Sequence, residues 1–207
     1  MSSRTGDLLL HPYTFFSGKS NETVNLIPPF ALVGAGAVFI AIIHVLFVVW
    51  DRSGWSAGVL TYSGLTQHYI MSSIATSFFM PFFIWGLFSV LIFGLSRVAG
   101  GTGSFPATLQ NVGYGMVPWT LSAIIPLGIF LHRFITYTGG PTFAGYSGLW
   151  LLPPVSCALP LLGIMIWSSY LWIIAVIHMD QLPLMKSAII TLLPVCVFLI
   201  LSLPVLY

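Results

Sequence analysis

The stretch ALVGAGAVFIAIIHVLFVVW, from Ala31 to Trp50, contains no Asp, Glu, Lys or Arg. An α-helix needs about 20 predominantly apolar residues to cross the hydrocarbon core of a bilayer. Backbone N–H and C=O groups inside a bilayer must be satisfied within the protein, so only helices and closed barrels span it. A barrel strand would show about ten residues of alternating polarity. Because this stretch is continuously apolar, it predicts a membrane-spanning helix.

The composition extends this prediction to the whole chain. Of the 207 residues, 57% are hydrophobic and 5% are charged, whereas an ordinary soluble domain has about 25% charged residues. Four further apolar runs are long enough to cross a bilayer. We therefore predict an all-α fold, a polytopic membrane helix bundle with five transmembrane helices. The expected spans are Leu26–Trp50, Tyr69–Leu95, Val112–Tyr137, Leu149–Met179 and Ala188–Leu206.

The chain divides into residues 1–25, a short cytoplasmic or interfacial segment, and residues 26–207, a single five-helix transmembrane domain. The first apolar run begins too far from the N-terminus, and is too long, for a cleaved secretory signal. In the N-terminal segment, Pro12 can start a short helix. Apolar residues around it, such as Phe15 and Phe16, would allow that helix to lie in the plane of the lipid headgroups.

The distribution of Lys and Arg predicts the orientation, because short cytoplasmic connections are enriched in both. With five spans, one side holds the N-terminus and the loops near Gly100 and Gln181, and the other side holds the remaining loops. The first side carries Arg4, Lys19, Arg97 and Lys186, and the second carries Arg52 and Arg133. We expect an integral membrane protein, in the cell membrane if prokaryotic, with a cytoplasmic N-terminus and an outward C-terminus.

Residues for catalysis are scarce. The sequence has no His-Glu-x-x-His, Gly-x-Ser-x-Gly or Walker motif. Its four carboxylates, Asp7, Glu22, Asp51 and Asp180, lie near span ends or outside the spans. A net charge of +2 without a basic stripe argues against nucleic-acid binding. We expect no enzymatic activity, no cofactor and no nucleic-acid partner.

A group of polar residues is predicted near the outer face. Its members are His44, Asp51, His68, His132 and Arg133. One interpretation is an outward vestibule in which Asp51 pairs with Arg133 and the histidines bind a solute, a proton or a metal ion. The favoured interpretation is that Arg133 extends to the headgroups and His44 makes one bond between helices, because functional buried charges lie nearer the midplane. We expect no metal site.

Prolines and small residues predict how the spans bend and pack. Five prolines lie inside apolar runs and should kink the helices, because each removes a backbone donor; they are Pro81, Pro118, Pro126, Pro160 and Pro194. Gly34 and Gly36 offer a small-residue face for close helix contact. The kinks are consistent either with static bends or with hinges that move during transport.

The sequence GGTGSF, Gly100 to Phe105, forms the turn after the second expected span. Its three glycines can take positive φ or let another segment approach closely. Ser104 can cap a helix that begins at Phe105 and Pro106. A phosphate-binding loop would need a lysine that is missing here. A structural turn is therefore the better interpretation.

Three motifs resemble the Ypt-interacting-protein (Yip) domain family. The opening DLLLHPYTFF, which contains Pro12 and Phe16, is similar to the segment before the family's first span. The middle motif, GGTGSFPATLQNVGYGMVP, is similar to the family's glycine-rich turn and the Gly-Tyr-x-x-x-Pro start of the third span. The residues of this motif that match are Gly100, Gly101, Gly103, Phe105, Gly113, Tyr114 and Pro118. The polar turn from Asp180 to Lys186 separates the last two spans, as in the family.

The resemblance implies a five-span architecture, a role like that of proteins in membrane traffic, and a candidate interaction surface at the matched motif residues. Eukaryotic members associate with Rab-type GTPases and with each other, but carry a longer N-terminal segment. The chain is more similar to compact prokaryotic members. Two functions follow as expectations: a non-catalytic scaffold that recruits partners or organises the bilayer, and a small solute, ion or lipid transporter. The expected partners are membrane lipids, proteins at the cytoplasmic face and further copies of the chain.

Overall fold

The computed structural model describes residues 7–20, 22–54, 63–122, 124, 127–128, 131 and 154–202. Every regular element in this part of the chain is a helix, which confirms the all-α prediction. The helices are α1 (Asp7–Leu10), α2 (Pro12–Lys19), α3 (Ile27–Gly54), α4 (Ser63–Val98), α5 (Phe105–Tyr114), α6 (Val117–Ser122), α8 (Pro154–Asp180) and α9 (Leu184–Ser202).

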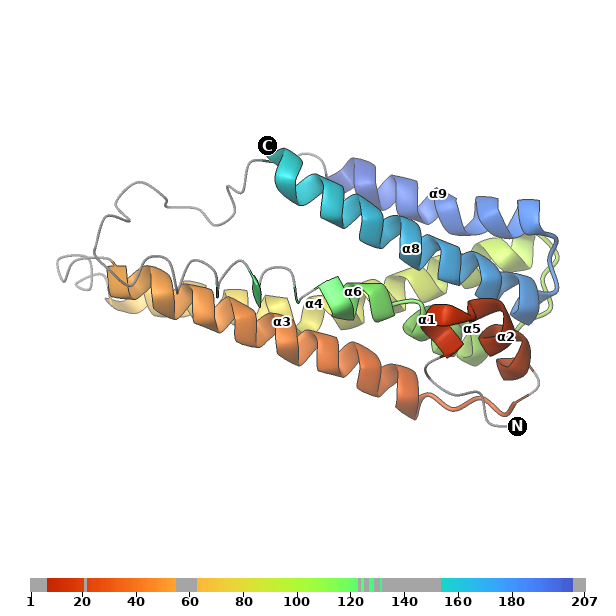
Figure 1. Cartoon of the computed structure of the whole chain (residues 1–207), viewed down its shortest axis with the longest axis horizontal. Coiled ribbons are helices and arrows are strands. Elements are labelled where there is room, and N and C mark those ends of the chain that lie inside the picture. The colour runs from red at the N-terminus through yellow and green to blue at the C-terminus, as the bar shows by residue number, and fades with distance from the viewer. Residues whose placement is uncertain are drawn as a thin grey trace.

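The long helices form two antiparallel pairs along the long axis of the molecule (Figure 1). Helix α3 contacts α4, and α8 contacts α9. The short helices α5 and α6 lie between the pairs, because α5 contacts α3, α4 and α8, and α6 contacts α3 and α8. Helices α1 and α2, the α4–α5 turn and the α8–α9 turn all lie at the right-hand end in Figure 1.

Three helices in the described part of the chain are long and apolar enough to cross a membrane. The qualifying stretches are Ile27–Leu46, Ile74–Val98 and Leu162–Asp180, and α9 carries a shorter apolar stretch, Leu184–Ile200. Large apolar side chains on these helices point outward, among them Phe83 and Ile166, which are 64% and 63% exposed. Such surfaces suit lipid rather than water. The chain is a helical membrane protein.

The third apolar run does not begin as expected. It was predicted to start a continuous span at Val112, but α5 ends at Tyr114 and α6 begins only at Val117. Pro118 therefore lies in the first turn of α6 rather than inside a helix, and the prediction of a kink there was wrong. The first turn tolerates proline because its N–H groups have no intrahelical acceptor.

Other prolines and glycines occupy the places that the sequence indicated. Pro81 lies inside α4 and Pro194 inside α9. Pro160 falls within α8, and Pro126 lies outside the described residues. A Cβ on Gly36 would come within 2.7 Å of Thr120 Oγ1, so this glycine allows close contact between α3 and α6.

The main core lies where α4, α5, α8 and α9 meet. Phe88 on α4 stacks on Trp172 of α8, with ring centroids 4.9 Å apart. Ile92 and Val176, one turn further along the same helices, are also almost fully buried. This core fixes the ends of α4 and α8 relative to α5, and it is these ends that build the candidate site.

Candidate functional site

We use the term motif end for the part of the molecule made by residues 7–26, 96–116 and 178–187. Its centre is the contact between the α4–α5 turn and Asp180, the last residue of α8. The backbone N–H of Gly103 donates to Asp180 Oδ1 at 2.9 Å, and the N–H of Thr102 donates to the Asp180 carbonyl at 3.3 Å. Asp180 is only 2% exposed. The side-chain carboxylate and the main-chain carbonyl of Asp180 thus each accept one backbone N–H and fix the turn against α8.

Each glycine of the turn has a specific reason to be glycine. Gly100 has φ = 92°, a conformation that favours glycine. A Cβ on Gly101 would collide with Ser96 Oγ, and a Cβ on Gly103 would collide with Asp180 Oδ1. One glycine thus takes positive φ and two allow close approach, as the sequence predicted in general terms.

Basic side chains also bind the backbone at this end. Arg97 Nη1 donates to the Gly101 carbonyl at 3.2 Å, and its guanidinium lies 5.2 Å from the centre of the Phe93 ring. Lys186 Nζ donates to the Ala99 carbonyl at 3.1 Å. The α4–α5 turn is therefore held both by α4 itself and by the start of α9.

Helix α5 follows Ser104, which occupies the N-cap position but makes no side-chain bond to the helix. Two indole groups hold the helix instead. Trp85 Nε1 donates to the Leu109 carbonyl at 2.8 Å, and Trp172 Nε1 donates to the Val112 carbonyl at 2.9 Å. The Val112 carbonyl is one of the last four of α5, which lack intrahelical partners, and the Leu109 carbonyl lies about one turn earlier. The indoles of α4 and α8 thereby position α5 between the two helix pairs.

The N-terminal segment packs on the protein. Leu8, Phe15 and Phe16 are 1–2% exposed and pack with Leu171 and neighbouring residues of α8. The Phe15 ring lies 5.0 Å from the ring of Tyr114. These side chains therefore pack on α5 and α8, which offer them a protein surface that excludes water. That the segment lies in the plane of the lipid headgroups stays a prediction.

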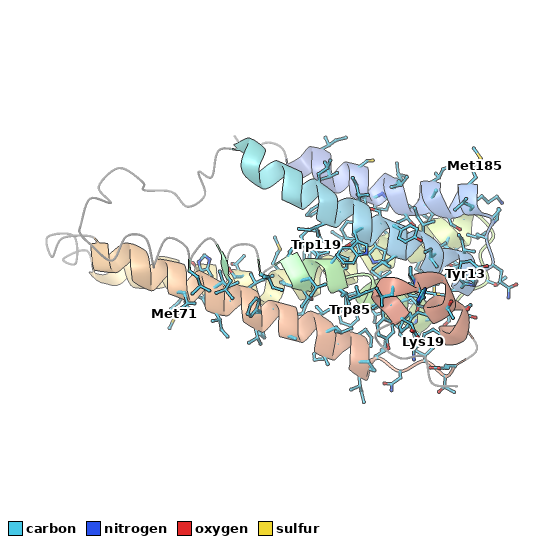
Figure 2. The ribbon with its side chains drawn as sticks, in the orientation of Figure 1. Tyr13, Lys19, Met71, Trp85, Trp119 and Met185 are labelled. Carbon is cyan, nitrogen blue, oxygen red and sulfur yellow. The ribbon has the colours of Figure 1, made fainter. Side chains whose placement is uncertain are left out.

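The other face of the segment is open. Leu10 is 77% exposed and Tyr13 is 62% exposed, and Figure 2 shows Tyr13 at the surface of the motif end. The Tyr13 ring meets the ring of His178 edge-on, with centroids 4.3 Å apart. Helix α2 begins at Pro12, as predicted.

A cavity of about 290 Å³ opens at the motif end. Its walls come from the chain after α2, the first turns of α5 and the end of α8, and include Lys19, Glu22, Ser104, Asn111 and His178. Lys19 forms an ion pair with Glu22. Asn111 Oδ1 and His178 Nε2 are buried and have no hydrogen-bond partner. The cavity wall is therefore polar, and two of its residues carry buried bonding atoms that the protein itself leaves without a partner.

The structure places most residues of the family-like motifs in the interior of the motif end. Phe16, Gly101, Gly103, Gly113, Tyr114 and Pro118 are buried, Pro12 is half-buried, and Gly100 and Phe105 are exposed. A Cβ on Gly113 would come within 2.6 Å of Pro29 Cβ and 2.9 Å of Trp85 Nε1. The motifs therefore build this end of the molecule, and only part of them reaches its surface.

The outer polar group lies at the opposite end of α3 and α4. His44 is half-buried on α3, Asp51 belongs to α3 and His68 belongs to α4. His132 and Arg133 lie outside the described residues. Within the described part of the chain, no three His, Cys, Asp or Glu residues are placed so that they could hold a metal ion.

The sequence did not reveal the contacts that organise the motif end. The sequence places Asp180 in a polar turn between spans, and Trp85 and Trp172 simply fall within the expected spans Tyr69–Leu95 and Leu149–Met179. The sequence offered two signals. Asp180 is one of four acidic residues in the chain. A glycine-rich turn also leaves space that another residue must fill. Neither signal identifies which residue meets the turn.

A family model described as the Yip1 domain matches residues 6–206, nearly the whole chain. Comparison with curated proteins gave no match, and neither did comparison with solved structures.

Proposed function

Because the chain belongs to the Yip1 domain family, we propose that it is a non-catalytic membrane scaffold whose motif end faces the cytoplasm and recruits protein partners or organises the bilayer. The observation that carries this proposal is the joining of three distant segments into one surface. Gly103 of the α4–α5 turn bonds to Asp180 of α8, and Phe15 of the N-terminal segment packs on Tyr114 of α5.

The exposed part of this end is suited to contact with another molecule. Thr102, Ser104 and Phe105 on the α4–α5 turn are exposed, and so is Gln181 on the α8–α9 turn. The bonds at Ala99, Gly101, Thr102 and Gly103 hold the backbone of the turn in place, which lowers the entropy cost of binding. A preformed surface on a membrane anchor is what a recruiting scaffold requires.

The full topology belongs to the same proposal. Five spans within residues 26–207 would place both turns of the motif end on the side of the N-terminus, and Lys19, Arg97 and Lys186 at this end favour the cytoplasm. Eleven of the 26 residues of the third apolar run, Val112–Tyr137, lie outside the described residues. In this topology α9 would supply the last span, with the apolar stretch Leu184–Ile200, which is shorter than the three stretches that qualify as spans.

A transporter is the less favoured alternative. Solute sites of secondary transporters lie near the bilayer midplane, between discontinuous helices. The polar cavity described above instead lies at the end of α8, with Met179 and Gln181 in its wall. The positions of Pro81 inside α4 and Pro194 inside α9 are compatible with either function, since neighbouring helices in membranes tolerate proline.

Site-specific photocrosslinking in intact cells tests the recruiting function. A photoreactive residue at Thr102 should give a discrete product with another protein. The same residue at Met71, which is 63% exposed and lies near the other end of α4 (Figure 2), should not give that product. Identical products from both positions, or no protein product from Thr102, would contradict a partner at the motif end. A small solute that copurifies at the midplane would favour transport instead.

A further inference from the structure

The cavity at the motif end lies at the height where the membrane spans begin and end. Val24 in its wall precedes Ile27, where the first apolar stretch starts, and Met179 in its wall precedes Asp180, where another ends. A bilayer has its phosphates and headgroup amines at this level, just outside the hydrocarbon core. The group most abundant beside the cavity is therefore a lipid headgroup.

One side of the cavity presents groups that bind an anion. Lys19 contributes an ammonium, which forms an ion pair with Glu22 of the same wall, and Ser104 contributes a hydroxyl that makes no bond to α5. Ala107 in the first turn of α5 also lines the cavity. First-turn N–H groups have no intrahelical acceptor, and the helix dipole adds positive potential there. Phosphate oxygens bind well to such a combination.

The cavity also presents acceptors. Asn111 is 6% exposed, its Nδ2 donates to Met179 Sδ at 3.4 Å, and its Oδ1 has no partner. A buried acceptor without a donor is costly, so a ligand N–H placed there would be favoured. Glu22 adds a carboxylate to the same wall. These groups suit a primary ammonium, which offers three N–H donors.

We propose that this cavity binds the phosphate and the primary ammonium of a zwitterionic headgroup, supplied by an aminophospholipid such as phosphatidylethanolamine. The phosphate lies at Lys19, Ser104 and the start of α5, and the ammonium lies at Asn111 and Glu22. The cavity volume of about 290 Å³ is at the lower limit of small-molecule sites, roughly 300–1,000 Å³, which admits such a headgroup.

Apolar surface beside the cavity is available for the acyl chains. Val24 is 45% exposed and Ile27, at the start of α3, is 77% exposed. Acyl chains that follow this surface enter the bilayer beside the first span. His178, whose Nε2 is buried without a partner, can donate to a phosphate oxygen or accept from the ammonium. This site does not depend on protein recruitment, since it shares only Ser104 with the exposed turn and otherwise uses groups inside the cavity.

Native mass spectrometry of the full chain in detergent tests the proposal, with equal amounts of phosphatidylethanolamine, phosphatidylcholine and phosphatidylglycerol added. We expect phosphatidylethanolamine to be retained preferentially. The trimethylated ammonium of phosphatidylcholine has no N–H to donate to Asn111, and phosphatidylglycerol has no ammonium. Equal retention of the three lipids would overturn the proposal.

Matched variants locate the site. Lys19→Gln should lower retention of phosphatidylethanolamine roughly tenfold, the loss expected for one charge-assisted hydrogen bond. Lys186→Gln removes the same charge from the same end but lies outside the cavity, and should leave retention unchanged. If the two variants lose lipid equally, the cavity is not the site. Unfolding temperatures of both variants show whether either has lost its fold.

Adding soluble O-phosphoethanolamine distinguishes the two possible ligands, which are the headgroup of a lipid and a free phosphoamine. Displacement of bound phosphatidylethanolamine by this compound would confirm that the headgroup is what the cavity recognises. Binding of the soluble compound without retention of the lipid would overturn the lipid assignment and identify a free phosphoamine as the ligand. Failure of both to bind would overturn the site itself, without affecting the crosslinking result at Thr102.

Discussion

Gly103 shows how strongly a single residue is constrained at the motif end. A Cβ at this position would collide with Asp180 Oδ1 and lie 3.1 Å from Asp180 Cγ. We expect Gly103→Ala to lower the free energy of unfolding by about 1–3 kcal/mol through overpacking. Thermal unfolding of the purified protein in detergent measures this change.

Gly94 provides the matched control, because a Cβ there would meet nothing within 4 Å. Gly94→Ala should leave the unfolding temperature unchanged or raise it, since alanine is favoured over glycine inside a helix by about 1 kcal/mol. Equal unfolding temperatures for the two alanine variants would show that the Gly103 contact with Asp180 does not constrain the fold.

The need for glycine at the turn was predictable from the sequence, but its partner was not. The pattern Gly-Gly-x-Gly indicates positive φ or close approach, and the structure has both. That Asp180 fills the space cannot be read from the sequence, because 77 positions separate it from Gly103. An acidic residue at the end of an apolar run is equally typical of a span that simply meets water.

At the scale of elements, α5 depends on two indole donors from neighbouring helices. Trp172→Phe removes the bond from Nε1 to the Val112 carbonyl and leaves this buried acceptor unpaired, which should cost about 1–3 kcal/mol of stability. Trp167→Phe on the same helix is the control, because that side chain is 39% exposed. Unfolding in detergent should show a loss for Trp172→Phe that clearly exceeds the loss for Trp167→Phe; the reverse order would contradict this account of α5.

The N-terminal segment depends on its buried rings. Phe15→Ala removes a side chain that is 2% exposed, and losses for such changes are about 3–5 kcal/mol. We expect the segment to leave α8 and trypsin to cleave after Lys19 much faster than in the unaltered protein. Leu10→Ala alters a residue that is 77% exposed and should not change the rate. Unchanged cleavage of Phe15→Ala would mean that the packing of Phe15 does not hold the segment.

Helix boundaries were predicted well where hydropathy alone decides them. The first expected span, Leu26–Trp50, corresponds to α3 (Ile27–Gly54), and the fourth ends within one residue of α8. The break between α5 and α6 was missed, because the residues around it are apolar and read as a continuous run. Gly115 lies at this break, and a Cβ there would collide with the Trp172 ring, a contact that no local pattern encodes.

At the scale of the whole molecule, the fold places the most specific motif at one end of a helical bundle. The N-terminal segment, the α4–α5 turn and the α8–α9 turn meet there (Figure 1). This agrees with the predicted five-span order, in which the N-terminus and the turns after the second and fourth spans lie on the same side of the membrane. The cytoplasmic orientation of the motif end was inferred from a few Lys and Arg residues. Recruitment of cytoplasmic partners depends on this orientation.

Cysteine accessibility in intact cells tests that claim most directly. Cys157 and Cys196 are first replaced by alanine, and Thr102→Cys and Ser53→Cys are then introduced singly at the two ends of the bundle. With a membrane-impermeant maleimide, we predict that Ser53→Cys is labelled in intact cells and that Thr102→Cys is labelled only after permeabilisation. Labelling of Thr102→Cys in intact cells, with Ser53→Cys protected, would contradict a cytoplasmic motif end.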